Sequence, residues 1–170
     1  GRFKGITVGK RIGNAWKKNR FRSAYLRNTL WDLGYAVDTL ETAVNWDKVT
    51  DTMVRVETGL EQALDSVDES ILAFSHLSHV YAIGSSIYTT FVFRLADTPQ
   101  KTLDHWRKLK QAASQAIVEA GGTISHHHGI GRDHKPYLEA EKGAVGVNTL
   151  RQMFAYLDPN RQMNPGKLLP

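Results

Sequence analysis

Residues 71–95 read ILAFSHLSHVYAIGSSIYTTFVFRL, and this stretch decides the predicted fold. The runs 71–81 and 86–95 are rich in β-branched and aromatic residues, which is typical of strands, and Gly84 lies between them. Two strands joined so closely pair as an antiparallel hairpin. Because the run 86–95 is apolar on both faces, we expect it to lie in the middle of a sheet.

The residues before the hairpin predict a further strand and an amphipathic helix. Residues 35–44 (YAVDTLETAV) roughly alternate and contain many β-branched residues, so they predict a strand. Within residues 49–67, apolar side chains recur three or four positions apart along one stripe, which predicts a helix. Either Asn45 or Asp47 is placed to cap the start of this helix.

A second helix and a last strand follow the hairpin. Thr98 and Pro99 suit the cap and first turn of a helix whose apolar stripe ends at Gly121 and Gly122. The next residues, TISHHH (123–128), predict a short strand. The order is therefore β-α-β-β-α-β, which predicts an α+β fold with a ferredoxin-like antiparallel sheet and helices packed on one face.

Further helices flank this unit. Residues 20–33 carry apolar side chains at helical spacing and stop at Gly34, which predicts a helix. Residues 135–143 and 145–158 predict two short C-terminal helices, the second ending at the Asp158-Pro159 pair.

The composition fits one globular domain, or one domain with part of another. A chain of 170 residues buries roughly two-thirds of its unfolded surface. The absence of cysteine excludes disulfides, thiolate metal sites and cysteine nucleophiles. No apolar run approaches the ~20 residues that a bilayer span needs. Since the sequence starts at Gly1 and not at Met, we expect a fragment of a longer protein.

The positive charge is concentrated near the start of the chain. The formal net charge is +5, and nine Lys and Arg residues precede Asp32, the first acidic residue. Such a stretch indicates an anionic partner, or a basic surface that is merely solvated.

Three of the seven histidines stand side by side in GGTISHHHGIGRDH, residues 121–134. In a strand, His126 and His128 point to one side and His127 to the other, so an ordinary hydrogen-bonded role is one interpretation. A metal site is the second, because neutral imidazole is a common ligand for zinc, nickel or copper. Since neighbouring strand positions diverge, that site would have to recruit other histidines, namely His76, His79 or His134.

Catalysis is the third interpretation of the histidines. Imidazoles that line a pocket beside a cofactor move protons near neutral pH, and Gly129 and Gly131 would let a ligand approach closely. The other motifs are weaker, because the chain contains neither a P-loop nor a nucleophile elbow. The aromatic signature of RNA-binding sheets is also missing, so we expect no nucleic-acid partner. A free-standing module that binds anionic ligands or nucleic acid remains the alternative from another class.

Three segments resemble one enzyme family. Residues 121–138 (GGTISHHHGIGRDHKPYL), 38–46 (DTLETAVNW) and 157–170 (LDPNRQMNPGKLLP) are similar to the C-terminal half of the FAD-linked oxidases of the vanillyl-alcohol-oxidase class. They most resemble the alkyldihydroxyacetonephosphate (alkylglycerone-phosphate) synthase branch. The resemblance implies that residues 1–134 form a substrate-binding cap domain, truncated at its start. Residues 135–170 would be C-terminal helices and a tail that pack against an FAD-binding domain outside this chain.

The resemblance also implies an activity. In the synthase branch, a fatty alcohol replaces the acyl group of acyl-dihydroxyacetone phosphate on FAD, which yields an ether-lipid precursor without net oxidation or reduction. The alternative enzyme is a metal-independent FAD oxidase or dehydrogenase of a D-2-hydroxy acid or alcohol. The substrate would be a small phosphorylated or carboxylate-bearing molecule, and a lipid chain, a membrane surface and a homodimer are all compatible with it. We expect a cytoplasmic, bacterial protein.

The resemblance assigns roles to individual residues, except for Tyr88 and Arg94, whose roles are inferred from their positions in the sequence. The expected catalytic residues are His126, His127, His128 and Tyr88, with His127 or His128 transferring the proton. The expected substrate-binding residues are His76, His79, Arg94, Glu41 and Trp46. Asn164 and Lys167 would lie near the cofactor. Related D-2-hydroxyacid dehydrogenases bind a metal, but His127 replaces one of their ligands and Tyr88 another, so we expect no metal.

Overall fold

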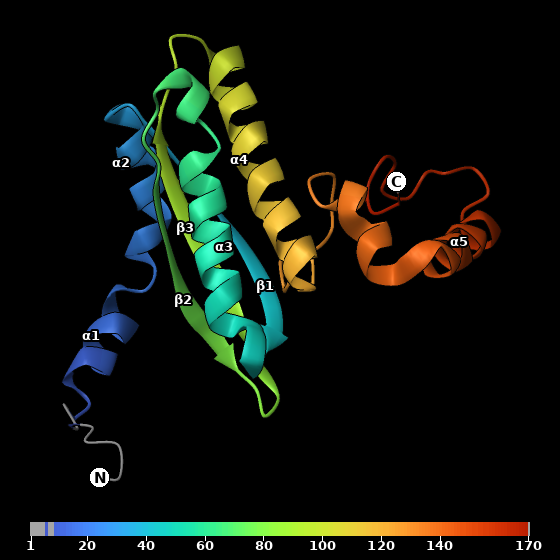
Figure 1. Ribbon diagram of the computed structural model, residues 1–170, viewed down its shortest axis with the longest axis horizontal. Helices are drawn as coiled ribbons and strands as arrows, with labels where there is room; N and C mark the ends of the chain where they lie inside the picture. Colours follow the sequence, from blue (N-terminus) through green and yellow to red (C-terminus); the bar gives the residue numbers. More distant parts are fainter. Residues whose placement is uncertain (1–5, 7–8, 170) are drawn as a thin grey trace.

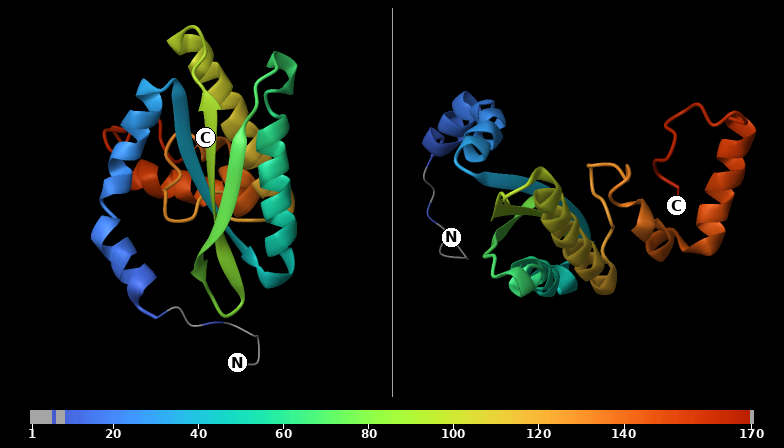
Figure 2. Two further views of the ribbon diagram at one scale, coloured as in Figure 1. Left: turned by 90° about the vertical axis from the view of Figure 1, so that its left-hand side faces the viewer. Right: turned by 90° about the horizontal axis from the view of Figure 1, so that it is seen from above.

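The computed structural model describes residue 6 and residues 9–169, whose elements surround one three-stranded sheet (Figures 1 and 2). The strands are β1 (Tyr35–Asn45), β2 (Leu72–Val80) and β3 (Gly84–Arg94). The α-helices are α1 (Arg11–Asn19), α2 (Leu26–Asp32), α3 (Val49–Gln62), α4 (Pro99–Ala120) and α5 (Leu138–Leu157). Short 3-10 helices span Arg22–Tyr25, Trp46–Lys48, Asp65–Val67 and Lys135–Tyr137.

The sheet is antiparallel and has the strand order β1-β3-β2. β3 therefore lies in the middle, as its two-sided apolar sequence predicts. The β2-β3 turn is tight, because the backbone N–H of Tyr81 donates to the carbonyl of Gly84 at 2.8 Å. Helices α3 and α4 pack against each other and cover one face of the sheet (Figure 2). The predicted ferredoxin-like α+β architecture is confirmed.

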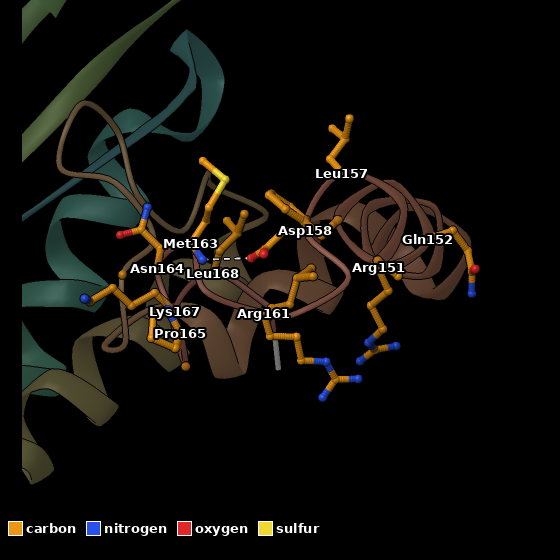
Figure 3. A pocket seen from close by; sticks show the side chains of 15 residues that line it. Arg151, Gln152, Leu157, Asp158, Arg161, Met163, Asn164, Pro165, Lys167 and Leu168 are labelled. Atoms are coloured by element: carbon orange, nitrogen blue, oxygen red, sulfur yellow. Dashed lines mark hydrogen bonds between the residues drawn. The ribbon is translucent and has the colours of Figure 1, made fainter.

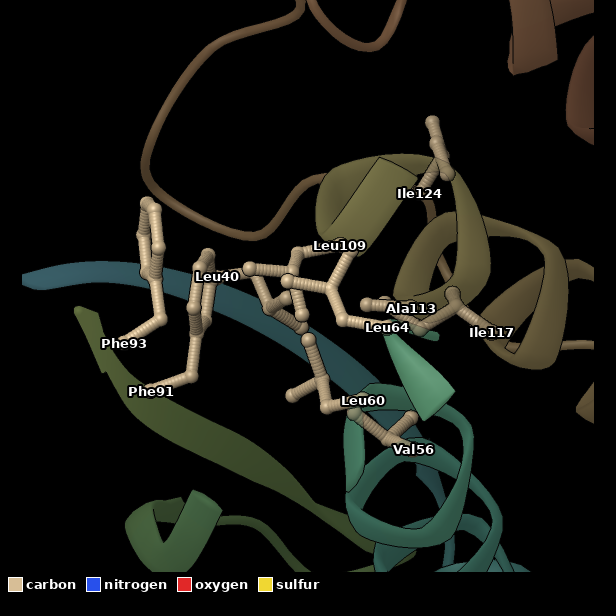
Figure 4. Close-up of a cluster of buried hydrophobic side chains, with 10 residues drawn as sticks. All are labelled: Leu40, Val56, Leu60, Leu64, Phe91, Phe93, Leu109, Ala113, Ile117 and Ile124. Atoms are coloured by element: carbon tan, nitrogen blue, oxygen red, sulfur yellow. The ribbon is translucent and has the colours of Figure 1, made fainter. Parts of the chain in front are cut away.

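The hydrophobic core lies between this face of the sheet and helices α3 and α4 (Figure 4). Its buried members are Leu40, Val56, Leu60, Leu64, Phe91, Phe93, Leu109, Ala113, Ile117 and Ile124. Burying one such leucine or phenylalanine contributes about 1.5–3 kcal/mol. Side chains alternate along β1, so Leu40 and Thr42 face this core while Glu41 points to the other face of the sheet.

Helix α4 begins and ends as its sequence predicts. The Thr98 hydroxyl accepts a hydrogen bond from the backbone N–H of Lys101 at 3.2 Å, and Pro99 occupies the first turn. Gly121 ends the helix in the left-handed region with φ 70°. From the α3 side, the Lys48 ammonium donates to the Ala120 carbonyl at 3.2 Å, which satisfies one of the last free carbonyls.

The prediction of a regular strand at residues 123–128 is wrong. The backbone N–H groups of Thr123 and His126 donate to the carbonyls of Ala43 and Glu41, so the segment does run beside β1, where a fourth strand would lie. It ends there because His127 has a positive φ of 62° and the N–H of His128 bonds back to the carbonyl of His126. The three histidines therefore do not alternate between two faces.

Three helix boundaries also differ from their predictions. Residues 22–25 form a 3-10 turn, so α2 begins only at Leu26, and α1 was not predicted from the sequence. Helix α3 ends at Gln62 instead of residue 67, and neither Asn45 nor Asp47 caps it, because the 3-10 turn Trp46–Lys48 makes Lys48 its N-cap residue.

The C-terminal helix α5 stands away from the sheet (Figure 1). It combines the two predicted short helices, because the backbone at Gly143 is non-helical, with φ 68°, and divides it there. It ends at Leu157, directly before the Asp158-Pro159 pair, as predicted. Within the described residues, no helix combines the length and the apolar character that a bilayer crossing needs.

Candidate functional site

The candidate site is built around Glu41, a carboxylate in the middle of β1. Its side chain is only 3% exposed, although it lies on the face of the sheet that α3 and α4 leave uncovered. A buried carboxylate needs hydrogen bonds or positive charge beside it, because burial strongly disfavours the ionised form. The side chains around Glu41 are therefore candidates for a functional site.

Three imidazoles surround this carboxylate. Nδ1 of His126 lies 3.2 Å from Oε1 of Glu41, and Nδ1 of His79 lies 3.5 Å from the same oxygen. Nε2 of His128 lies 3.5 Å from the other oxygen, Oε2. His79 comes from the end of β2, whereas His126 and His128 come from the loop that follows α4. The fold thus brings together two parts of the sequence that are almost fifty residues apart.

The pKa of Glu41 is lowered from its ordinary value by these neighbours. Burial by itself raises the pKa, but hydrogen bonds from Ser86 and His126 and the positive potential of His126 and His128 outweigh it. Glu41 is therefore an anion at neutral pH. A buried anion with several imidazoles beside it is a suitable setting for proton transfer.

The rings pack closely above the carboxylate. His127 stacks on His126 with ring centroids 3.9 Å apart, and its edge meets His79 at 4.6 Å. The left-handed backbone of His127 makes this possible, because it turns the ring back over its neighbour and not to the opposite side. On the other side, the Tyr81 hydroxyl lies 3.0 Å from Nε2 of His126. We call Glu41, His79, His126, His127 and His128 the histidine cluster.

Two predicted residues extend the histidine cluster across the sheet. Tyr88 of β3 pairs with Glu41 in the strand register, and its ring centroid lies 5.4 Å from that of His128. His76 of β2 pairs with Tyr88 on its other side at a centroid distance of 5.2 Å. The Tyr88 hydroxyl donates to Oγ1 of Thr39 at 3.2 Å. Both residues therefore face the same side of the sheet as Glu41.

Two other predicted substrate contacts lie elsewhere. Arg94 is at the far end of β3 and pairs with Glu69 at 3.0 Å. Trp46 reaches the cluster only indirectly, because its indole N–H donates to the backbone carbonyl of Tyr81 at 3.2 Å. Tyr81 and Ser86 were not identified from the sequence. The signal for Tyr81 was present, since the expected strand at 71–81 places it on the same face as His79.

Asn164 and Lys167 lie in a separate cavity of about 770 Å³ between α5 and the tail (Figure 3). Its walls are largely apolar, with cationic side chains among them; the lining includes Phe154, Leu157, Met163, Leu168, Arg151, Arg161 and Lys167. The tail is tied to the loop after the histidines, because the N–H of Leu168 donates to the carbonyl of Gly131 at 2.9 Å. Apolar walls with cationic groups suit a planar ring system that carries an anionic tail, as FAD does.

Four members of the cluster also offer potential metal ligands. Glu41, His79, His126 and His127 each contribute one nitrogen or oxygen, and these atoms lie within 4.8 Å of one another. His134, which the sequence offered as a further ligand, is not in this group. It is buried, and that burial together with the positive charge of Lys110 lowers its pKa.

The chain is similar to one known family over almost its whole length. Residues 7–168 match the family described as FAD linked oxidases, C-terminal domain. The chain belongs to this family. Its members are FAD-dependent enzymes, so the expectations of a flavoenzyme and of FAD as cofactor are confirmed.

Individual relatives agree with this assignment. The alkyldihydroxyacetonephosphate synthase of Caenorhabditis elegans is 32% identical over 159 residues, which cover 92% of this chain and 26% of that protein. The synthase of Trypanosoma brucei brucei is 27% identical over 168 residues, covering 99% of this chain and 27% of that protein. An uncharacterized FAD-linked oxidoreductase of Escherichia coli strain K12, YgcU, is 25% identical over 134 residues, which cover 78% of this chain and 28% of that protein.

A solved structure shows the same fold. An alkyldihydroxyacetonephosphate synthase superposes with a TM-score of 0.60 at 20% identity, covering 95% of this chain and 25% of that one. The chain thus spans about a quarter of the length of these relatives. Because the relatives come from eukaryotes and bacteria alike, they do not support the expectation of a bacterial source.

Proposed function

We propose that this chain is the substrate-binding C-terminal part of an FAD-dependent enzyme that exchanges an acyl for an alkyl group on dihydroxyacetone phosphate. In that reaction a fatty alcohol and acyl-dihydroxyacetone phosphate give alkyl-dihydroxyacetone phosphate and a fatty acid, without net oxidation. The observation that carries the proposal is the histidine cluster, in which four imidazoles gather over one buried carboxylate. Similarity to alkyldihydroxyacetonephosphate synthases supports it.

The cluster suits an exchange reaction, because such a reaction needs protons to be taken from one group and delivered to another. The substrate must lose a proton next to its carbonyl, the leaving carboxylate must depart, and the incoming alcohol must lose its own proton. Imidazole is the side chain best matched to such transfers near neutral pH. His127 and His128 are exposed members of the cluster, so they are the proposed proton-transfer residues.

The uncovered face of the sheet offers a surface for the substrate. Leu72 and Phe74 lie on this face in line with His76, and their exposed fractions are 61% and 48%. Exposed apolar side chains beside a polar cluster suit a molecule with an anionic head and an alkyl chain. In this arrangement the imidazole N–H groups hold the head, and Leu72 and Phe74 contact the start of the chain.

FAD would be bound mainly by a domain outside this chain. Bound FAD supplies the electrophilic and electron-accepting chemistry of the family. Asn164 and Lys167, in the cavity between α5 and the tail, are the proposed contacts from this chain. We propose residues 1–134 as the cap domain and residues 135–170 as the segment that packs on the FAD domain.

The proposal is tested on the full-length protein that contains this chain. Purified protein is incubated without oxygen with acyl-dihydroxyacetone phosphate and a radiolabelled fatty alcohol, and the products are separated. We expect label in an alkyl ether product and an unbleached flavin absorption band at the end of the reaction. Bleaching of the flavin by D-lactate or another hydroxy acid, with no ether product, would instead establish the redox alternative that the similarity to FAD-linked oxidoreductases supports.

A further inference from the structure

Two residues of the site have no place yet in the proposed reaction. Glu41 cannot contact a substrate directly, because its side chain is 3% exposed and lies beneath the imidazoles. Tyr81 follows the end of β2. Its hydroxyl meets the ring of His126, and its ring stacks on that of His79 with centroids 6.3 Å apart. Each of them touches a different nitrogen of the same histidine.

We propose that Glu41 and Tyr81 are positioning residues that clamp the ring of His126 through both of its nitrogens. Oε1 of Glu41 lies 3.2 Å from Nδ1, and the Tyr81 hydroxyl lies 3.0 Å from Nε2. The role of this clamp in catalysis rests on the function proposed above. The clamp itself follows from the contacts alone.

Hydrogen-bond chemistry fixes the direction of both contacts. An ionised carboxylate only accepts hydrogen bonds, so Nδ1 of neutral His126 carries the proton and Nε2 accepts one from the Tyr81 hydroxyl. Oε1 of Glu41 and Nδ1 of His126 are both buried, and within the described residues neither makes a well-aligned hydrogen bond, although the two atoms lie only 3.2 Å apart. Leaving either atom unsatisfied would be costly, so each is the natural partner of the other.

The clamp gives the three consecutive histidines different roles. His126 has no nitrogen left for a substrate, and its side chain is 15% exposed, whereas that of His128 is 31% exposed. The second oxygen of Glu41 lies 3.5 Å from Nε2 of His128, so the same carboxylate also orients this more accessible ring. His126 therefore serves as the support on which His127 stacks and beside which His128 is held.

The backbone around the clamp is itself fixed. The Trp46 indole donates to the Tyr81 carbonyl at 3.2 Å, and the backbone N–H of His126 donates to the Glu41 carbonyl at 2.9 Å. The first bond fixes the backbone that carries Tyr81, and the second fixes the backbone of His126 beside that of Glu41. If packing alone held the His126 ring, the backbone on its two sides would not need to be fixed by these hydrogen bonds.

The first test reads the proton on His126 directly. In full-length protein labelled with ¹⁵N-histidine, NMR distinguishes an Nδ1–H from an Nε2–H imidazole. We expect the Nδ1–H form for His126, the reverse of the form that free histidine prefers. Glu41→Leu should shift it to Nε2–H, and Tyr81→Phe should produce a mixture, whereas Tyr156→Phe, at an exposed tyrosine of α5, should change nothing. An Nε2–H form in the unmodified protein would overturn the clamp.

The second test separates positioning from substrate contact. In the alkyl-exchange assay, Tyr81→Phe and Glu41→Leu should lower kcat by on the order of 10²-fold, because a displaced catalytic ring has this effect. KM should change by less than about threefold, since neither residue touches the substrate. Glu41→Asp, which restores the charge, should recover part of the loss. An increase in KM at constant kcat would overturn the positioning role. If the unmodified protein lacks the exchange activity, the proposed function fails, while the NMR result still decides the clamp.

Discussion

The two faces of the three-stranded sheet use the same strands for different purposes. One face is apolar and sealed by α3 and α4, with Leu40 and Phe91 at its centre (Figure 4). The other face carries Glu41, Tyr88 and His76 side by side, and the loop after α4 folds over one edge of it. Because side chains alternate along a strand, neighbours such as Leu40 and Glu41 serve stability and chemistry respectively. Substitutions on the two faces should therefore have separable effects.

The largest effect on stability is expected on the sealed face. Leu60 of α3 is fully buried against this face, so Leu60→Ala removes apolar contacts and leaves a cavity. We expect a loss of about 2–5 kcal/mol in the free energy of unfolding, measured by denaturant titration. Leu72→Ala, on the face of the sheet that α3 and α4 leave uncovered, is the matched control. Since that side chain is 61% exposed, its replacement should change the free energy by less than about 0.5 kcal/mol. Equal losses would show that both faces are covered in solution.

A smaller effect is expected where the two faces are linked. The Thr42 hydroxyl faces the core and donates to the Thr123 carbonyl at 2.7 Å, which holds the loop that leads to the histidines. Thr42→Val leaves that carbonyl without its donor, at a cost of about 1–3 kcal/mol in unfolding free energy. Thr52→Val is the control, because the Thr52 hydroxyl is equally buried and has no partner within the described residues. Its replacement should be neutral or stabilising, and identical losses would contradict the role of the bond.

The sealed face could be predicted from the sequence to a large extent. Two apolar stripes at helical spacing and three alternating or apolar runs specified α3, α4 and the three strands, and Thr98, Pro99 and Gly121 marked the ends of α4. Each of these signals is local, because it depends on residues within one element. The missed α1 has no buried residue, and the shortened α3 ends before Val67, which is exposed.

The uncovered face of the sheet, with the histidine cluster, could be predicted only in part. The sequence identified the three consecutive histidines, Tyr88 and His76, and the structure brings all five together. It did not identify the positive φ of His127, which overrides the strand alternation and turns the rings toward one another. It also did not identify the position of Glu41 beneath the imidazoles. These features depend on how the loop after α4 meets β1, which no local pattern records.

The pH dependence of stability offers a further test, which concerns the buried His134. Burial, followed by the nearby Lys110 charge, lowers the pKa of His134, against the opposing influence of Asp133 and Asp38. A histidine with a lowered pKa contributes stability above its unfolded pKa of about 6.5, and loses it as the pH falls further. We expect His134→Leu to weaken the fall in melting temperature between pH 7 and pH 5, measured by circular dichroism. Parallel curves for the variant and the unmodified protein would contradict this assignment.

The smallest effect is expected from metal removal. The four potential ligand atoms of the cluster lie within 4.8 Å of one another, and ligands that sit 2.0–2.1 Å from a tetrahedral zinc ion are roughly 3.4 Å apart. In the proposed clamp, Nδ1 of His126 faces Glu41 and Nε2 faces the Tyr81 hydroxyl, so this ring has no nitrogen left for an ion. Dialysis of the full-length protein against a strong chelator should therefore leave the alkyl-exchange rate unchanged, and metal analysis should find less than one ion per protein. Loss of activity on chelation, restored by zinc, would show that a metal ion and not a proton neutralises the charge of Glu41. The histidine cluster would then resemble the site of a metal-assisted dehydrogenase.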